Sequence, residues 1–562
     1  MSRMEIFKDF LSQRKGHGLR IPAPYMLHHI KNMKKPHHRD SWGITPYSLY
    51  LTILAAPHFL RASHPPTLHN STDWTALEIS GYCKAKVVGS VTADKIRTIV
   101  PLPVPIKIID MELADMIGGL ADFSASGIST GYFEGSRKRR SVLDTTFACR
   151  LALERGLDAR SRCSIAVADI EKYYDFLQPL KVAQHLESLV SVGSAEPMDG
   201  SSVLDISVTL LCLHVFPRIA LRVGTAVATM PSKNTGMLTG SASSAASGRL
   251  PPADMARCLL PNWQSQGLGL QVPGSPGLCL MSYVDNFIAV GATAADNVAV
   301  LESAEQFLRS RWNLRFGASS REVLPCAGAH PSTLPKDAVK WPVRESIRCL
   351  GCILQRNGRS DRCVLDALHR AYRAVTLNCG NGLHRAGRSA KFRFMNSCVR
   401  SVGRWKWASW TYIQKTADLL DNFQKHLCSI LWRVIPESGE SHFSYMDRLH
   451  RNSKLVAQDA GLWSESWACD VVEWWKHTDR NHCEGWTKAI SGWNTQTWLQ
   501  QQRDFWANKY PAALGPQAHR TRTNTRVLRG TPSMRWSDGA AWAEQVAMSV
   551  GHGGFGDCPR PQ

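Results

Sequence analysis

Two aspartates stand where short apolar runs end. Ser164-Ile165-Ala166-Val167-Ala168 leads into Asp169, as when a buried strand delivers a carboxylate to its end. Residues 278–290 contain two β-rich runs around a tight polar pair, which predicts a hairpin with Asp285 at its tip. Each acid alone is more often a turn residue or a strand-end cap. On adjacent strand ends, however, the two carboxylates could hold two divalent cations.

Pairs of divalent cations of this kind catalyse nucleotidyl transfer. They activate a 3′-hydroxyl as the nucleophile and stabilise the leaving pyrophosphate. The surrounding residues decide whether the pair has this role, because isolated acids at strand ends are common.

Three segments resemble, in order, the palm motifs of non-LTR (LINE-type) retrotransposon reverse transcriptases. Residues 169–175, Asp-Ile-Glu-Lys-Tyr-Tyr-Asp, resemble the first palm motif. Residues 236–245, Gly-Met-Leu-Thr-Gly-Ser-Ala-Ser-Ser-Ala, resemble the Gly-x-x-Gln-Gly-x-x-x-Ser-Pro segment. Residues 283–286, Tyr-Val-Asp-Asn, resemble the Tyr-x-Asp-Asp hairpin. The resemblance implies an RNA-directed DNA polymerase that uses two Mg²⁺ ions, with Mn²⁺ as a substitute.

The resemblance also implies roles for individual residues. Asp169 and Asp285 would be the catalytic metal ligands, with the Ile170 backbone carbonyl and the Asn286 amide beside them, and Tyr283 belongs to the same hairpin motif. The residues expected at the nucleotide or template are Arg97, Lys107, Tyr174, Gly236, Thr239 and Gly240. Tyr174 would pack under the sugar and exclude a 2′-hydroxyl, although the same residue suits a helix core.

Further pieces match more loosely. Arg140 to Asp144, with Gly131 to Gly135 before it, resembles a Gly-Phe-x-x-Gly-Arg-Ser-x-x-Asp stretch, provided that residues 136–139 are a basic insertion. Leu350-Gly351 resembles the primer-grip turn. Residues 34–44 resemble a stretch that precedes the fingers.

Four departures from the family pattern bear on activity. Asn286 stands where a second Asp is usual, Thr239 where Gln is usual, Ala245 where Pro is usual and Ser320 where a Lys is usual. An amide is a weaker, neutral ligand, and the neighbouring Arg321 cannot act as a proton donor. Two alternatives therefore stay open: a catalytically decayed nucleic-acid-binding relic of the same fold, and an RNA-dependent RNA polymerase.

The composition favours a nucleic-acid partner. The chain has 67 Lys and Arg against 46 Asp and Glu, a formal charge of +21, and so basic a protein usually binds a polyanion. We expect an RNA template, a DNA primer, deoxynucleoside triphosphates and a ribonucleoprotein with the element's RNA as partners.

No membrane segment or signal peptide is expected. The apolar stretch at residues 203–221 contains Asp205, His214, Pro217 and Arg218, which a bilayer span would not tolerate. The sixteen cysteines are scattered and predict reduced, buried thiols. Cys469 and His477 have the spacing of a zinc knuckle, but Glu465 stands where its first Cys is usual and the last ligand is displaced, so no zinc site is expected. We therefore expect an intracellular protein of the nucleus or cytoplasm.

The expected fold class is α+β: a right-hand polymerase of fingers, palm and thumb, with a helical thumb and C-terminal segment. We expect an N-terminal extension at 1–90, fingers and palm at 91–355, a helical region at 356–510 and a basic flexible tail at 511–562. Residues 418–432 show the periodicity of an amphipathic helix.

Overall fold

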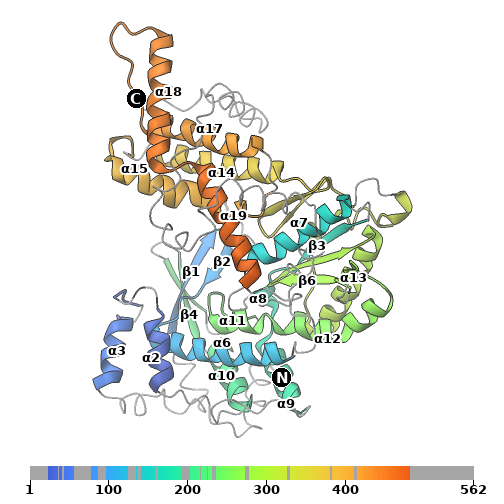
Figure 1. Ribbon diagram of the computed structural model, residues 1–562. Coiled ribbons are helices and arrows are strands. Elements are labelled where there is room, and N and C mark those ends of the chain that lie inside the picture. Colours follow the sequence, from blue (N-terminus) through green and yellow to red (C-terminus); the bar gives the residue numbers. More distant parts are fainter. Residues whose placement is uncertain are drawn as a thin grey trace.

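The chain folds as a helix-rich α+β protein whose described residues form two four-stranded sheets and one two-stranded hairpin (Figure 1). The computed structural model describes residues 23–33, 35, 37–40, 43–55, 78–85, 96–124, 135, 141–158, 162–191, 203–215, 217–223, 226–230, 236–272, 277–325, 330–379, 383–410 and 414–480. The predicted tail at 511–562 lies outside these residues, and the proposed domain boundaries stay predictions.

The sheet that carries both candidate aspartates is antiparallel, with the strand order β6-β7-β3-β8. Its strands are β3 (Ser164–Asp169), β6 (Leu280–Tyr283), β7 (Asn286–Gly291) and β8 (Glu322–Leu324). The helix α13 (Ala294–Phe307) packs against β3 and β7. The first five residues of β3 are buried and Asp169 is partly exposed, so burial fixes the strand and presents its final carboxylate.

A second sheet has the order β2-β1-β4-β5 and contains one parallel pair, β1 with β4. Its strands are β1 (Glu78–Ala85), β2 (Ile96–Ile99), β4 (Arg218–Val223) and β5 (Ala226–Met230). The apolar stretch at 203–221 is divided between helix α10 (Val203–Val215) and β4. No helix in the described part of the chain has the length and apolar character to cross a bilayer.

Further helices lie before and between these strands along the chain. They are α2 (Ala23–Lys31), α3 (Pro46–Ala55), α6 (Val104–Ser124), α7 (Val142–Asp158), α8 (Tyr173–Phe176), α9 (Pro179–Ser191), α11 (Ala242–Ser247) and α12 (Leu250–Ser265). Asp40, in the segment predicted to precede the fingers, accepts hydrogen bonds from the backbone N–H groups of Ile44 (2.8 Å) and Val104 (2.6 Å). It therefore joins that segment to the first residue of α6.

A hairpin leads into the C-terminal helices. Its strands are β9 (Ser346–Cys349) and β10 (Cys352–Gln355). The helices that follow are α14 (Asp361–Cys379), α15 (Arg388–Phe394), the π-helical η7 (Met395–Arg400), α16 (Ser401–Trp407), α17 (Gln414–Leu431), α18 (His442–Ala460) and α19 (Trp463–Arg480). The amphipathic helix predicted at 418–432 is confirmed as α17.

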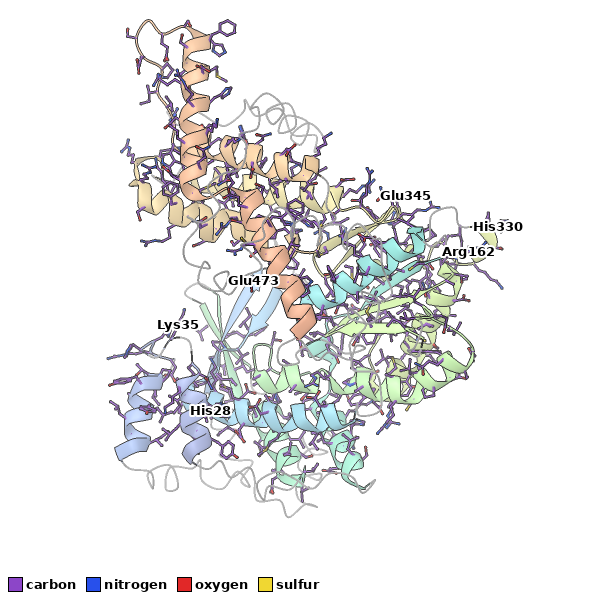
Figure 2. The ribbon with its side chains drawn as sticks, in the orientation of Figure 1. His28, Lys35, Arg162, His330, Glu345 and Glu473 are labelled. Atoms are coloured by element: carbon purple, nitrogen blue, oxygen red, sulfur yellow. The ribbon has the colours of Figure 1, made fainter. Side chains whose placement is uncertain are left out.

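The last described helix returns to the body of the molecule. Figure 1 shows α19 descending from the helical layer towards α7, and Figure 2 places Glu473 of α19 at this junction. The rings of Phe147 on α7 and Trp474 on α19 meet edge to face, with centroids 6.0 Å apart. The described cysteines are free thiols and most are buried, which confirms that prediction for the described residues.

Candidate active site

Both aspartates lie at one end of the β3–β7 ladder. Asp169 pairs with Asn286 across the ladder, and the backbone N–H of Ile170 donates to the backbone oxygen of Asp285 over 2.8 Å. The predicted hairpin is confirmed, because β6 and β7 are joined by Val284 and Asp285 alone. The sequence-distant acids are thus neighbours on adjacent strands.

The hairpin tip has an unusual backbone. Val284 has a φ of 59°, a left-handed conformation that is a genuine outlier for a β-branched residue. Gly135 packs directly on it: an added Cβ at Gly135 would lie 2.2 Å from the Val284 backbone nitrogen. Backbone strain of this kind persists where the surroundings determine it and is enriched at functional sites. Gly135 belongs to the loosely matched segment before Arg140, so the structure places part of that segment at the hairpin.

The backbone of Asp169 is held from the other side. Its N–H donates to Ser320 Oγ (2.9 Å), and its carbonyl accepts from Ser320 Oγ (3.1 Å) and from the Gly317 N–H (2.9 Å). Ser320, which stands where the resembled motif usually has Lys, therefore holds the Asp169 backbone. The neighbouring Arg321 forms an ion pair with Glu305 over 2.8 Å.

Asn286, the first residue of β7, is in contact with the aspartate beside it. The Asn286 Nδ2 donates to Asp285 Oδ1 over 3.0 Å. Burial, followed by the nearby Tyr174 and the charge of Asp285, raises the pKa of Tyr173 well above its usual range. The charge of Asp285 therefore acts on Tyr173 of α8.

The segment at 236–240 closes against α8 and β2. Gly236 has a φ of +76°, and a Cβ there would lie 2.5 Å from the Tyr174 carbonyl oxygen, which accepts from the Met237 N–H over 2.7 Å. The Thr239 carbonyl accepts from the Val100 N–H over 3.0 Å. Gly236 thus occupies a position that only glycine fits, and the segment joins β2 to the aspartate site.

The other predicted residues are placed as follows. Tyr174 is half-buried beside Tyr173, with ring centroids 5.3 Å apart. Lys107 is exposed on the first turn of α6. Arg97 lies on β2, and its backbone is opposite that of Lys84 in the β1–β2 ladder. Arg140 lies outside the described residues. The roles of these residues stay predictions.

The predicted primer-grip turn is a tight hairpin. Leu350 and Gly351, between β9 and β10, have φ values of 50° and 80°, as a two-residue turn with both residues left-handed requires. The buried Lys406 donates from Nζ to the Gly351 carbonyl over 3.3 Å and to Asp366 Oδ2 over 2.9 Å. The turn is thereby attached to α14 and α16.

The donor atoms around Asp169 and Asp285 suit hard divalent cations. The predicted ligands offer carboxylate, backbone carbonyl and amide oxygens, which are the atoms that Mg²⁺ and Mn²⁺ prefer. Among the described residues there is no group of three or more His, Cys, Asp or Glu side chains arranged as a metal site. Any cation here would therefore depend on the two aspartates, with oxygens of other kinds.

Sequence reasoning missed two buried residues behind the 236–240 segment. Asp110 on α6 accepts hydrogen bonds from Ser241 Oγ (2.7 Å), the Ala242 N–H (2.6 Å), the Ser243 N–H (3.0 Å) and Ser243 Oγ (2.5 Å). His214 on α10 contacts Leu238 and Ser243. A signal was present: each is a polar residue within an apolar helical run.

Comparisons with known proteins give weak likenesses only. No protein-family model and no curated protein matches the chain. Apo telomerase from Candida tropicalis, truncated from its C-terminal domain, is 10% identical with a TM-score of 0.34, over 50% of this chain and 54% of that chain. Telomerase from Candida albicans, in complex with a TWJ fragment of telomeric RNA, is 11% identical with a TM-score of 0.34, over 80% and 71%. The corresponding complex from Candida tropicalis is 11% identical with a TM-score of 0.36, over 74% and 64%.

This chain spans about half the length of the first of these telomerase chains. At such TM-scores the likeness carries no argument about this chain. The assignment of the site therefore rests on the chain's own residues and their geometry.

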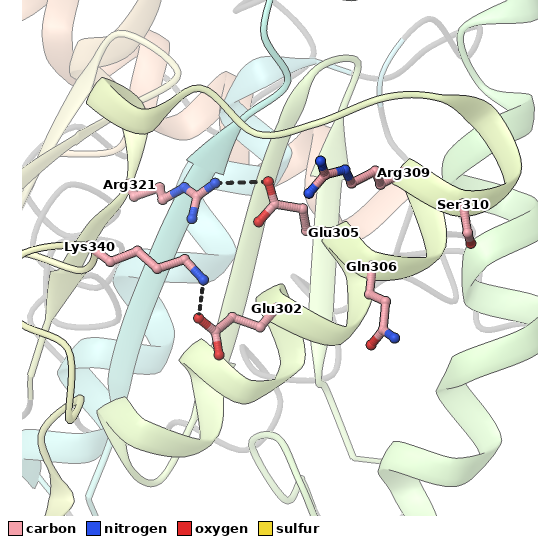
Figure 3. Close-up of a pocket in the computed structure, with 7 residues that line it drawn as sticks. All are labelled: Glu302, Glu305, Gln306, Arg309, Ser310, Arg321 and Lys340. Carbon is pink, nitrogen blue, oxygen red and sulfur yellow. Dashed lines mark hydrogen bonds and ion pairs between the residues drawn. The ribbon is translucent and has the colours of Figure 1, made fainter.

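One pocket, of about 510 Å³, is lined by neither of the two aspartates (Figure 3). It is lined by Glu302, Glu305, Gln306, Arg309, Ser310, Arg321 and Lys340. Its acids and bases largely neutralise one another: Lys340 pairs with Glu302 over 2.5 Å, and Arg321 with Glu305 over 2.8 Å. We do not assign the candidate active site to this pocket.

Proposed function

We propose that this chain is an RNA-directed DNA polymerase that extends a DNA primer on an RNA template by two-metal nucleotidyl transfer. The observation that carries the proposal is the pairing of Asp169 with Asn286, beside Asp285 at the tip of a two-residue hairpin. Two carboxylates on adjacent strand ends are the minimum that this chemistry needs.

Each residue has a part in the proposed reaction. Asp169 and Asp285 would hold two Mg²⁺ ions, with the Ile170 carbonyl as a further oxygen. When bound, these ions lower the pKa of the primer hydroxyl and neutralise charge on the leaving pyrophosphate. Ser320 and Gly317 hold the Asp169 backbone in place through the hydrogen bonds described above.

The nucleotide and nucleic acids occupy the surroundings. Gly236, Thr239 and Gly240 contact the template base and incoming nucleotide, and Tyr174 packs under its sugar. Arg97 and Lys107 meet the triphosphate, and the Leu350-Gly351 turn supports the primer. In this arrangement residues 91–355 are fingers and palm, and the helices after 356 are the thumb.

The element-level proposal follows from the motif resemblance. We assign the chain to a LINE-type retrotransposon, where it forms a ribonucleoprotein with the element's RNA in the nucleus or cytoplasm. The support is the ordered set of motifs from about residue 34 to residue 354, together with the charge of +21.

Primer extension on poly(rA)/oligo(dT), with Mg²⁺ or Mn²⁺, tests the function. The wild-type chain should incorporate dTTP, and both Asp169→Asn and Asp285→Asn should abolish incorporation in either metal. Ser310→Ala, at an exposed site in the pocket, is the matched control and should leave the rate unchanged.

The outcomes separate the alternatives. Binding of primer–template without extension in either metal, for the wild type and also for Asn286→Asp, would favour the relic. Preference for ribonucleotides over deoxynucleotides would favour an RNA polymerase. Extension by Asp285→Asn would refute the site assignment.

A further inference from the structure

A buried chain of polar groups runs behind the 236–240 segment. The Leu238 N–H donates to His214 Nδ1 over 3.0 Å, His214 Nε2 is 2.8 Å from Ser243 Oγ, and Ser243 Oγ donates to Asp110 Oδ1 over 2.5 Å. His214 and Ser243 are fully buried and Asp110 is 2% exposed. The chain connects α10, α11 and α6 to the backbone of the segment.

The partners fix the direction of these hydrogen bonds. A backbone N–H can only donate, so His214 Nδ1 is the acceptor for Leu238 and the ring proton is on Nε2. Nε2 therefore donates to Ser243 Oγ, and the Ser243 hydroxyl in turn donates a hydrogen bond to Asp110. The imidazole is held in one tautomer and one orientation, as a buried polar network does when its members are satisfied.

Asp110 holds the opposite end. Besides Ser243 Oγ, it accepts from Ser241 Oγ and from the backbone N–H groups of Ala242 and Ser243, at the start of α11. Ser244 Oγ in turn donates to the Leu238 carbonyl over 2.8 Å. The backbone N–H and the backbone carbonyl of Leu238 are thus both held by buried side chains.

The residues next to Leu238 face outward. Thr239 is half-buried and Gly240 is exposed, while Thr239 is joined to the end of β2 through Val100. A shift of the Leu238 backbone would therefore move Thr239 and Gly240 directly, because they follow it in the chain.

We propose that His214 is a positioning residue for the incoming nucleotide. Its hydrogen bond to Leu238 fixes the position of the Thr239–Gly240 backbone, which contacts the nascent base pair. This inference rests on the proposed function. It assigns to His214 an effect on nucleotide affinity, which a residue that only stabilised the core would not have.

Two substitutions at position 214 separate the two roles. His214→Phe fills the volume but removes both hydrogen bonds. His214→Asn keeps an acceptor near the Nδ1 position and so preserves the bond from Leu238. His185→Phe replaces another buried histidine, on α9 beside Trp312, and controls for loss of a buried imidazole.

The experiment measures the KM for dTTP, the Kd for primer–template and amide hydrogen exchange at Leu238 in full-length protein. His214→Phe should raise the KM about fivefold, the effect of losing one hydrogen bond of ordinary strength, with the primer–template Kd unchanged. His214→Asn should restore most of the KM, and Leu238 should exchange faster in the Phe variant than in the Asn variant. His185→Phe should change neither the KM for dTTP nor the rate of amide exchange at Leu238.

Equal KM values for His214→Phe and the wild type, or equal exchange in the Phe and Asn variants, would overturn the proposal. If the wild type extends no primer, the proposed function fails. In that case the exchange measurement still decides whether His214 holds the Leu238 amide.

Discussion

Asn286 places a neutral amide beside Asp285 in the candidate metal site. It donates to Asp285 Oδ1 over 3.0 Å, where a second carboxylate would repel Asp285 and add charge for a cation. A neutral neighbour that also occupies one oxygen lowers the affinity for the hard ion Mg²⁺. In the proposed site we therefore expect Asp285 to provide metal binding and Asn286 to tune it.

Asn286→Asp should raise Mg²⁺-dependent extension, by about tenfold if it acts as groups beside metal ligands commonly do. The wild type should be more active in Mn²⁺ than in Mg²⁺, and the ratio should fall in the variant. Titration of each metal against the extension rate measures this. An unchanged ratio would remove Asn286 from the metal site.

His185 gives the fold a pH dependence. It is buried against Trp312, with Asp254, Arg311 and Arg257 as its charged neighbours, and burial lowers its pKa from 6.5 to about 4. The unfolded chain then binds a proton more readily than the folded chain between pH 6.5 and pH 4, so stability is lost as the pH falls through this window.

The loss should reach about 3 kcal/mol, since one pKa unit corresponds to about 1.4 kcal/mol. Urea unfolding at pH 7, 6, 5 and 4 measures it, with His185→Gln as the reference that lacks the titrating ring. The wild type should lose more stability on acidification than the variant. Parallel curves would show that the ring is not responsible.

The hairpin between β6 and β7 depends on a residue from a distant segment. Gly135 lies so close to Val284 that a methyl group would clash with backbone, which cannot rotate away as a side chain can. The left-handed Val284 and the absent Cβ of Gly135 are thus two parts of one contact.

Gly135→Ala should displace the hairpin tip and reduce the extension rate at least about tenfold, since small misplacement of reacting groups has effects of this size or larger. Gly119→Ala on α6 is the control, because a Cβ there meets nothing within 4 Å. That variant should keep full activity and be slightly more stable. A fully active Gly135→Ala would contradict the contact.

The whole molecule carries a large positive charge, and the helical region uses only part of it internally. Arg388 pairs with Asp459, and Lys391 is buried with its ammonium 5.7 Å from the Trp432 ring centroid. Arg385 and Arg393 are exposed on the same stretch. We therefore expect Arg385 and Arg393, rather than the ion-paired Arg388 or the buried Lys391, to contact a nucleic-acid backbone.

Affinity for an RNA–DNA duplex should fall steeply with salt, because phosphate contacts release counterions. Arg385→Gln and Arg393→Gln should each reduce the slope of log Kd against log salt by about one. Arg356→Gln, which removes a cation already paired with Glu345 over 3.0 Å, should change it less. Binding that does not depend on salt would leave the charge without a nucleic-acid role.

Local pattern determined much of this protein. The apolar run before Asp169, the hairpin around Asp285 and the helix at α17 are visible in sequence, because side-chain periodicity and turn composition act over a few residues. Only the tertiary structure decided that Asp169 pairs with Asn286, that Gly135 packs on Val284, and that Ser320 holds the Asp169 backbone. The Asp110–His214 network is of the same kind, since Asp110 is 133 residues from Ser243 and His214 is 29 residues from it. Contacts between distant segments depend on how sheets and helices pack, and no spacing along the chain encodes that directly.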